Sequence, residues 1–162
     1  MSKILTRAEV PVETTWNLDD IFPSREAWEQ ELNNIQRDIG TVTKYEGELS
    51  QGADTLLACL QAQEELSGRM SRAGAYAYLH QSGDSINPEN QTNASKARDL
   101  ASQVSSALSF IKSEIIALPD GTIDQYIADQ PELREFERSL RLLLQTKPHR
   151  LTAETEKVLA SL

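Results

Sequence analysis

The sequence has 162 residues, with 16 Lys or Arg against 25 Asp or Glu, a formal net charge of −9, two His and one Cys. These counts fit one globular domain, and the acidic balance argues against a nucleic-acid binder or a protein that binds anionic membranes, because both need clustered positive charge. No run of about 18 to 20 apolar residues and no signal-peptide core is present, so we expect a cytoplasmic protein.

The first predicted elements are an extended lead-in over residues 1–14 and a helix over about 25–45. An aromatic and apolar cluster, residues 16–24, lies between them and ends at Ser24, whose hydroxyl suits a helix N-cap. Apolar residues then recur at spacings of three and four, which is typical of one buried face of a helix. These residues are Trp28, Leu32, Ile35 and Ile39.

Two long helices are predicted next, over about 54–81 and about 88–118. Gly83 provides a stop between them, Asn87 an N-cap, and Pro88 suits the first helical position. Because the connection is short, the two helices must run antiparallel as a hairpin. Their buried faces are predicted as Leu56, Leu60, Gln63, Ser67, Met70, Ala73 and Ala77, against Ala94, Ala97, Ala101, Val104, Leu108, Ile111 and Ile115. Both faces are rich in small residues, which would allow close approach of the backbones.

Shorter helices are predicted after Pro119, over 122–129, from Pro131 and from Thr152. No pattern requires a strand, so the predicted fold is all-α. We expect an elongated helical bundle in which residues 15–162 form one lobe, with the hairpin over 54–118 and the shorter helices over 120–162. The sequence stops within an apolar helical pattern, which favours a larger protein truncated at the carboxyl end.

The inventory of reactive side chains is small. The two imidazoles, His80 and His149, do not begin the zinc-binding sequence His-Glu-x-x-His, and zinc needs three protein ligands in a catalytic site. Structural roles at a helix end and in a turn are the simpler interpretation of both. Cys59 has no basic neighbour in the preceding turn and is interpreted as a small core residue. We therefore assign no catalytic and no metal-binding residue.

Three other groups keep two interpretations open. Asp19 and Asp20 suit turn and helix-dipole partners better than an acid/base pair. A row of three arginines is either a salt-bridged surface or a contact for a peptide carboxylate. The row is Arg134, Arg138 and Arg141. Tyr76 and Tyr78, with His80, either border a groove that binds substrate or pack against a neighbouring helix.

Several segments together resemble the amino-terminal region of oligoendopeptidase F, a family of zinc metallopeptidases similar to thimet oligopeptidase. The resemblance covers about residues 16–160, and the order and spacing of its segments carry it. The segments are Trp16–Ser24 with Trp28, Tyr76–Leu79 followed by Asp84–Asn87, Ala107–Ile111 with Glu114 and Ala117–Pro119, and Lys147–His149 with Leu151 and Glu156.

The resemblance implies a helical lobe that forms one wall of a channel for oligopeptides. It also implies a zinc ion, held by His-Glu-x-x-His and a further Glu, in a catalytic lobe beyond residue 162. We therefore expect the chain alone to be inactive, with the missing catalytic lobe as its partner. Whether this chain alone counts as an enzyme is left open.

The alternative is a free-standing helical module that binds another protein through its hairpin. Reading the gene past codon 162 separates the two, since a continuing frame with His-Glu-x-x-His favours the peptidase. If the lobe interpretation holds, an uncovered apolar surface over residues 133–162 predicts that the isolated chain forms a homodimer or looser oligomer.

Overall fold

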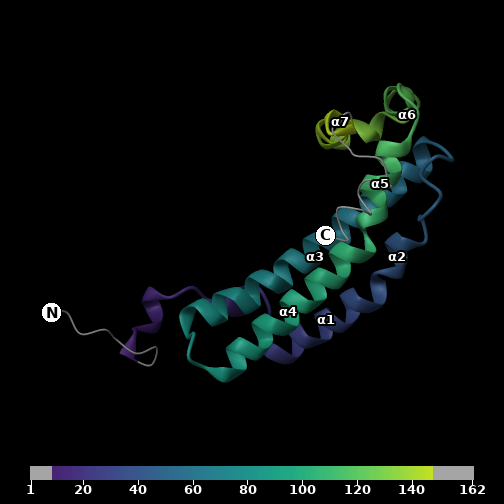
Figure 1. The fold of residues 1–162 in the computed structure, drawn as a ribbon. Helices are drawn as coiled ribbons and strands as arrows, with labels where there is room; N and C mark the ends of the chain where they lie inside the picture. Colours follow the sequence, from purple (N-terminus) through teal and green to yellow (C-terminus); the bar gives the residue numbers. More distant parts are fainter. Residues whose placement is uncertain (1–8, 148–162) are drawn as a thin grey trace, which may run out of the picture. The chain divides into compact units, whose positions relative to one another are not determined.

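The computed structural model describes residues 9–147, which divide into two compact units (Figure 1). Unit 1 contains residues 9–44 and 62–108, and unit 2 contains residues 45–61 and 109–147. All regular elements within residues 9–147 are helical, which confirms the predicted all-α fold. None of the helices in this range combines the length and the apolar character needed to cross a membrane.

The amino-terminal part of unit 1 contains the 3-10 helices η2 and η3 and the α-helices α1 and α2. They span Val12–Thr14, Leu18–Asp20, Arg25–Asp38 and Gly40–Thr43. The short η2 helix lies within the predicted extended lead-in. Ser24 caps α1 as predicted, since its hydroxyl accepts a hydrogen bond from the amide of Ala27 at 3.2 Å.

The helix predicted over about 25–45 is present as two α-helices, α1 and α2, which meet at Ile39, a residue whose φ of −51° and ψ of −38° are still helical. The hydroxyl of Thr41 donates to the carbonyl of Asp38 at 2.7 Å, and the amide of Val42 bonds to Ile39 only three residues back. A side chain that occupies a helix carbonyl and a glycine at position 40 both weaken the continuing helix.

The remaining helices of unit 1 are α4, Pro88–Ala107, and the part of α3, Ala53–Gly83, that lies in residues 62–83. Within the unit they run antiparallel, as the sequence predicts (Figure 1). The side-chain oxygen of Asn87 accepts hydrogen bonds from the amides of Glu89 at 2.9 Å and Asn90 at 3.4 Å, so the predicted N-cap is confirmed.

The predicted helix over 88–118 is interrupted at Leu108, whose φ of −90° and ψ of 0° leave the helical range. The chain continues as α5, Ser109–Ala117, which belongs to unit 2. Ser105, Ser106 and Ser109 surround the break, and serine is a weak helix former because its hydroxyl competes for backbone partners.

The core of unit 1 forms between α1, α3 and α4. Trp28, Ile35 and Ala73 are fully buried, and the indole Nε1 of Trp28 donates to the carbonyl of Ala73 at 2.9 Å. Arg69 on α3 adds two ion pairs to α1, with Glu31 at 2.6 Å and Asp38 at 2.9 Å. These contacts fix the central part of α3 against α1.

Unit 2 contains α5, the short helix α6, the 3-10 helix η4 and α7. The last three span Thr122–Asp129, Pro131–Phe136 and Glu137–Gln145. The helix predicted from Pro131 therefore begins as a 3-10 helix. Glu114 on α5 holds the loop before α3, because its carboxylate accepts from the amides of Gly47 at 2.6 Å and Leu49 at 3.3 Å. The helix predicted from Thr152 lies outside the described residues.

Candidate functional site

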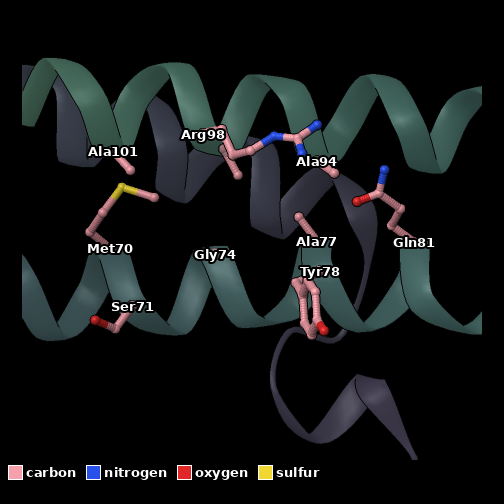
Figure 2. Close-up of a pocket in the computed structure, with 10 residues that line it drawn as sticks. Met70, Ser71, Gly74, Ala77, Tyr78, Gln81, Ala94, Arg98 and Ala101 are labelled. Atoms are coloured by element: carbon pink, nitrogen blue, oxygen red, sulfur yellow. The ribbon is translucent and has the colours of Figure 1, made fainter.

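A groove opens between α3 and α4 within unit 1 (Figure 2). Its volume is about 280 Å³, slightly below the range of roughly 300–1,000 Å³ that is typical of small-molecule sites. The residues that line it are Met70, Ser71, Gly74, Ala77, Tyr78 and Gln81 on α3 and Ala94, Ala97, Arg98 and Ala101 on α4. A cavity of this size has room for one or two side chains.

The floor of the groove is apolar. Met70, Ala77, Ala94 and Ala97 are buried residues of the core, and all four line the groove. Gly74 adds open space, because a Cβ placed there would meet no heavy atom within 4 Å. The sequence led us to expect that the small residues bring the two helix backbones into close contact. At Gly74 they do not. They line a hollow instead.

The polar side chains of the groove come from both helices. Gln81 extends from α3 into the space between the helices, and Arg98 extends along α4 towards Ala94 (Figure 2). Tyr78 lines the groove and is 66% exposed. The groove thus combines an apolar floor with an amide, a phenol and a guanidinium group.

Arg98 differs from the other cationic residues described in unit 1. Arg25, Arg37, Arg69 and Lys96 form ion pairs with carboxylates, and Arg72 donates to the carbonyl of Ile21. Lys44 also has an interaction partner. Within residues 9–44 and 62–108, Arg98 is the cation for which the structure records neither an ion pair nor a hydrogen bond.

Of the three residues predicted to border a groove, Tyr76 and His80 contact each other, whereas Tyr78 lies apart from them and lines the groove. Tyr76 is buried, with its ring centroid 5.4 Å from that of Phe22, 6.0 Å from Trp28 and 4.5 Å from His80. Burial raises the pKa of Tyr76, and the nearby charges of Asp19 and Glu26 raise it further. Residues two apart on a helix point in nearly opposite directions. Of the three, only Tyr78 lines the groove, and substrate binding by it stays a prediction.

His80 lies near the end of α3. Its backbone carbonyl accepts hydrogen bonds from the side-chain amide of Asn90 at 3.1 Å and from the amide of Asp84 at 3.1 Å. The imidazole packs edge-on against Tyr76. His80 thus lies where α3, α4 and their connection meet. His149, the other histidine of the sequence, lies outside the described residues.

Of the acidic and basic groups singled out in the sequence, Asp20 and Arg141 have recorded local partners, and the interpretation of Arg134 and Arg138 stays a prediction. The carboxylate of Asp20 accepts a hydrogen bond from the side-chain Nδ2 of Asn17 at 2.9 Å, which is the turn contact expected of it. Arg141 pairs with Glu137 at 2.8 Å and Asp124 at 3.0 Å, as expected of a salt-bridged surface. The carboxylates beside Arg141 raise its pKa, and the hydrogen bond that Arg141 donates to Glu137 has the largest effect.

The described residues do not fit a zinc site. Within residues 9–147 there is no group of three or more His, Cys, Asp or Glu side chains that could hold a metal ion. Cys59 is fully buried, and burial, with a smaller contribution from the charge of Glu114, raises its pKa to about 11. A thiol in this environment is a poor ligand and nucleophile. The predicted absence of metal-binding residues stays a prediction for the whole chain.

Sequence reasoning missed Gln81 and Arg98 and placed Ala101 on the buried face, whereas Ala101 is exposed and lines the groove. Leu100 is buried in its place. The available signal was the run of small residues facing each other on two helices, which the sequence analysis took as evidence for close packing. Side-chain volume alone does not distinguish tight packing from a hollow.

Known proteins resemble this chain along nearly its whole length. A family model described as Oligopeptidase F matches residues 114–162. Oligopeptidase PepF of Bacillus subtilis is 33% identical over 154 residues, which are 95% of this chain and 23% of that protein. Group B oligopeptidase PepB of Streptococcus agalactiae is 24% identical over 154 residues, 95% of this chain and 26% of that protein.

Solved structures agree with the sequence comparison. The crystal structure of oligoendopeptidase-F from Enterococcus faecium matches with a TM-score of 0.72 and 27% identity, over 85% of this chain and 27% of that chain. The resemblance to the amino-terminal region of oligoendopeptidase F is confirmed. A putative peptidase from Chlamydophila abortus matches with a TM-score of 0.80 at 20% identity, over 98% of this chain and 27% of that chain, and supports the fold alone.

The chain spans about a quarter of the length of the relatives it matches. The groove between α3 and α4 therefore lies in a part that resembles the beginning of a much longer peptidase. Its role in peptide hydrolysis belongs to the proposals that follow.

Proposed function

We propose that this chain acts as the amino-terminal helical lobe of a zinc oligopeptidase and forms one wall of a channel for short peptides. The observation that carries the proposal is the 33% identity to oligopeptidase PepF over 95% of this chain. Since the chain corresponds to about a quarter of that protein, the remaining part of such a protein would supply the catalytic residues. No step of peptide hydrolysis is assigned to the residues described above.

The described residues support a binding and shaping role. They offer no cluster for zinc, and their one thiol is buried, so neither metal-assisted nor thiol-based hydrolysis has its groups in residues 9–147. The part of α3 that lines the groove is held by the Trp28 hydrogen bond and the ion pairs of Arg69. A wall built in this way keeps its shape when a flexible peptide binds, which lowers the entropic cost of binding.

The first test uses the purified 162-residue chain. The zinc content is measured by inductively coupled plasma mass spectrometry. Cleavage is followed by the fluorescence of internally quenched peptides of about eight residues. We expect no cleavage above the blank and much less than one zinc per chain. One tightly held zinc per chain together with metal-dependent cleavage would contradict the proposal, because the chain would then be an enzyme by itself.

The second test is a chimera in which this chain replaces the matching region of PepF from Bacillus subtilis. We expect the chimera to cleave the quenched peptides and the rest of PepF alone to be inactive. A control chimera carries Trp28→Ala, which should unfold unit 1 and abolish cleavage. A chimera that is folded by circular dichroism and binds zinc, yet is inactive, would refute the proposal and favour a separate interaction module.

The association state of the chain is a further proposal. We expect the isolated chain to form a homodimer or looser oligomer, because a surface that meets the rest of the peptidase would be uncovered. In the described part of residues 133–162, Leu142 is a large apolar side chain with 53% exposure. Light scattering over a range of concentrations tests this expectation, and a monomer at every concentration would contradict it. Cytoplasmic location likewise stays a prediction.

A further inference from the structure

From the groove between α3 and α4 we infer a binding site for the carboxyl-terminal residue of a short peptide. The apolar side chain of that residue lies on the floor of the groove, and its carboxylate pairs with Arg98. The inference deepens the proposed function, since it rests on a peptide as the substrate class and names the end of the peptide that this lobe binds. It requires no catalytic group in this chain.

The floor of the groove supplies the apolar part of the site. Met70 on α3 and Ala94 and Ala97 on α4 form an apolar surface in a hollow of about 280 Å³. Gly74 leaves the α3 wall open, because no heavy atom lies within 4 Å of the position of a Cβ. An apolar side chain placed here removes its own surface and that of the floor from water, which favours binding.

Arg98 supplies the charge complementarity. In a chain with a net charge of −9, the other cations described in unit 1 have partners within the chain, whereas Arg98 has none recorded and lines the groove. A guanidinium group binds a carboxylate through two parallel hydrogen bonds, a geometry that suits the end of a peptide. The ligand of the groove is therefore expected to be an anion attached to an apolar group.

Gln81 favours a peptide over a fatty acid. Figure 2 shows its amide extending from α3 into the space between the helices, from the wall opposite Arg98. A glutamine side chain both donates and accepts hydrogen bonds, as a peptide bond does. A fatty acid offers an anionic head and an apolar tail but no amide, so it would leave Gln81 without a partner in the bound state.

The test is a binding measurement on the full chain by fluorescence anisotropy at low salt. The probe is a fluorescein-labelled peptide, Gly-Gly-Ala-Leu, with a free carboxylate. The comparison peptides are the same sequence with a carboxyl-terminal amide and a sequence that ends in Asp instead of Leu. We expect the amide and the Asp peptide to bind roughly tenfold more weakly, because each loses one of the two contacts. Octanoate serves as a competitor and should compete poorly.

Two variants test the named residues. Arg98→Gln should weaken the free-acid peptide about tenfold and leave the amidated peptide unchanged, so that the two peptides bind equally. Gly74→Phe fills the hollow and should weaken both peptides by about tenfold or more. The matched control is Gly68→Phe, because Gly68 is also a helical glycine of α3 with open space around it but does not line the groove. Lys112→Gln, in unit 2, controls for the loss of charge.

Three results with the peptides would overturn the inference, and a fourth comes from octanoate. They are an absence of saturable binding by the Leu peptide, continued preference of Arg98→Gln for the free acid, and equal effects of Phe at positions 68 and 74. Binding of octanoate more tightly than the peptide would also reject a peptide site. Circular dichroism confirms that each variant is folded. If the chain fails the binding test but the PepF chimera cleaves peptides, only the groove site is contradicted. If the chain binds the peptide but the chimera is inactive, only the proposed function is contradicted.

Discussion

The indole Nε1 of Trp28 on α1 donates a 2.9 Å hydrogen bond to the backbone carbonyl of Ala73 on α3. Both residues are fully buried, and Ala73 precedes Gly74, which lines the groove between α3 and α4. The bond therefore joins α1 to the segment of α3 that forms one wall of the groove. This hydrogen bond fixes the register of α1 against α3, which an apolar ring of similar size would not do.

Replacing Trp28 with Phe is expected to lower the free energy of unfolding by about 2–3 kcal/mol, from the lost hydrogen bond and the smaller ring. The matched control is Trp16→Phe, since Trp16 is 86% exposed and should change stability by less than about 0.5 kcal/mol. Urea unfolding followed by circular dichroism measures both. Equal effects of the two substitutions would show that the Trp28 contact does not stabilise unit 1.

The glycines of the chain are expected to respond to alanine in opposite directions. Gly74 is helical with open space around it, so Gly74→Ala should stabilise the chain by about 0.5–1 kcal/mol. Gly47 has a φ of +84°, which an alanine adopts only under strain, so Gly47→Ala should destabilise by about 1 kcal/mol. Urea unfolding measures the free energy of unfolding of both variants. If Gly74→Ala were destabilised, the added methyl group would have to clash with a neighbouring atom in the groove.

Cys59 is expected to be inert in the folded chain. Burial raises its pKa from an ordinary 9.0 to about 11, so at pH 8 the thiolate is on the order of a thousandth of the population. Labelling with a disulfide reagent at pH 8 should be slow without denaturant and complete in concentrated urea. Because the folded pKa is raised, the thiol favours the folded state fully below pH 9, and this contribution is lost as the pH rises towards 11. Rapid labelling of the native chain would contradict the burial of Cys59.

The ion pairs of Arg69 should make stability depend on pH in the acid range. The hydrogen bond from Arg69 is the largest cause that lowers the pKa of Glu31 from 4.5 and that of Asp38 from 3.8. Lowered carboxyl pKa values give stability that is present above these ordinary values and lost as the pH falls through the folded ones. Arg69→Met should therefore lower stability most at pH 7, with a difference that shrinks below pH 4.5.

Unfolding in urea between pH 3 and pH 7 measures this difference. The control is Arg98→Met, because Arg98 has no recorded ion pair and its replacement should have the same small effect at every pH. If the difference between the wild-type chain and Arg69→Met stayed constant down to pH 3, the two carboxylates would not be stabilised by Arg69 in the folded state.

The sequence by itself determined the helical class, most helix limits and the caps. Spacings of three and four in apolar residues have one compact solution, which is a buried helical face, and Ser24 and Asn87 cap helices through contacts within three residues. The same local rules did not predict the junction of α1 and α2 at Ile39, where the hydroxyl of Thr41 bonds to a helix carbonyl, or the break at Leu108, where the backbone leaves the helical range. The resemblance to oligoendopeptidase F also came from the sequence, because it depends on the order of segments and not on their contacts.

Only the tertiary structure decided which small residues pack and which line a hollow. Tyr76 and Tyr78 are equally aromatic in the sequence, yet one is buried beside Trp28 and the other lines the groove, because they lie on opposite sides of α3. Arg98 lines the groove without a recorded partner, whereas Arg69 has partners that only the packing of the helices brings within reach. Pairing of side chains 30 to 70 residues apart depends on how helices meet in space, and no local pattern in the sequence carries that information.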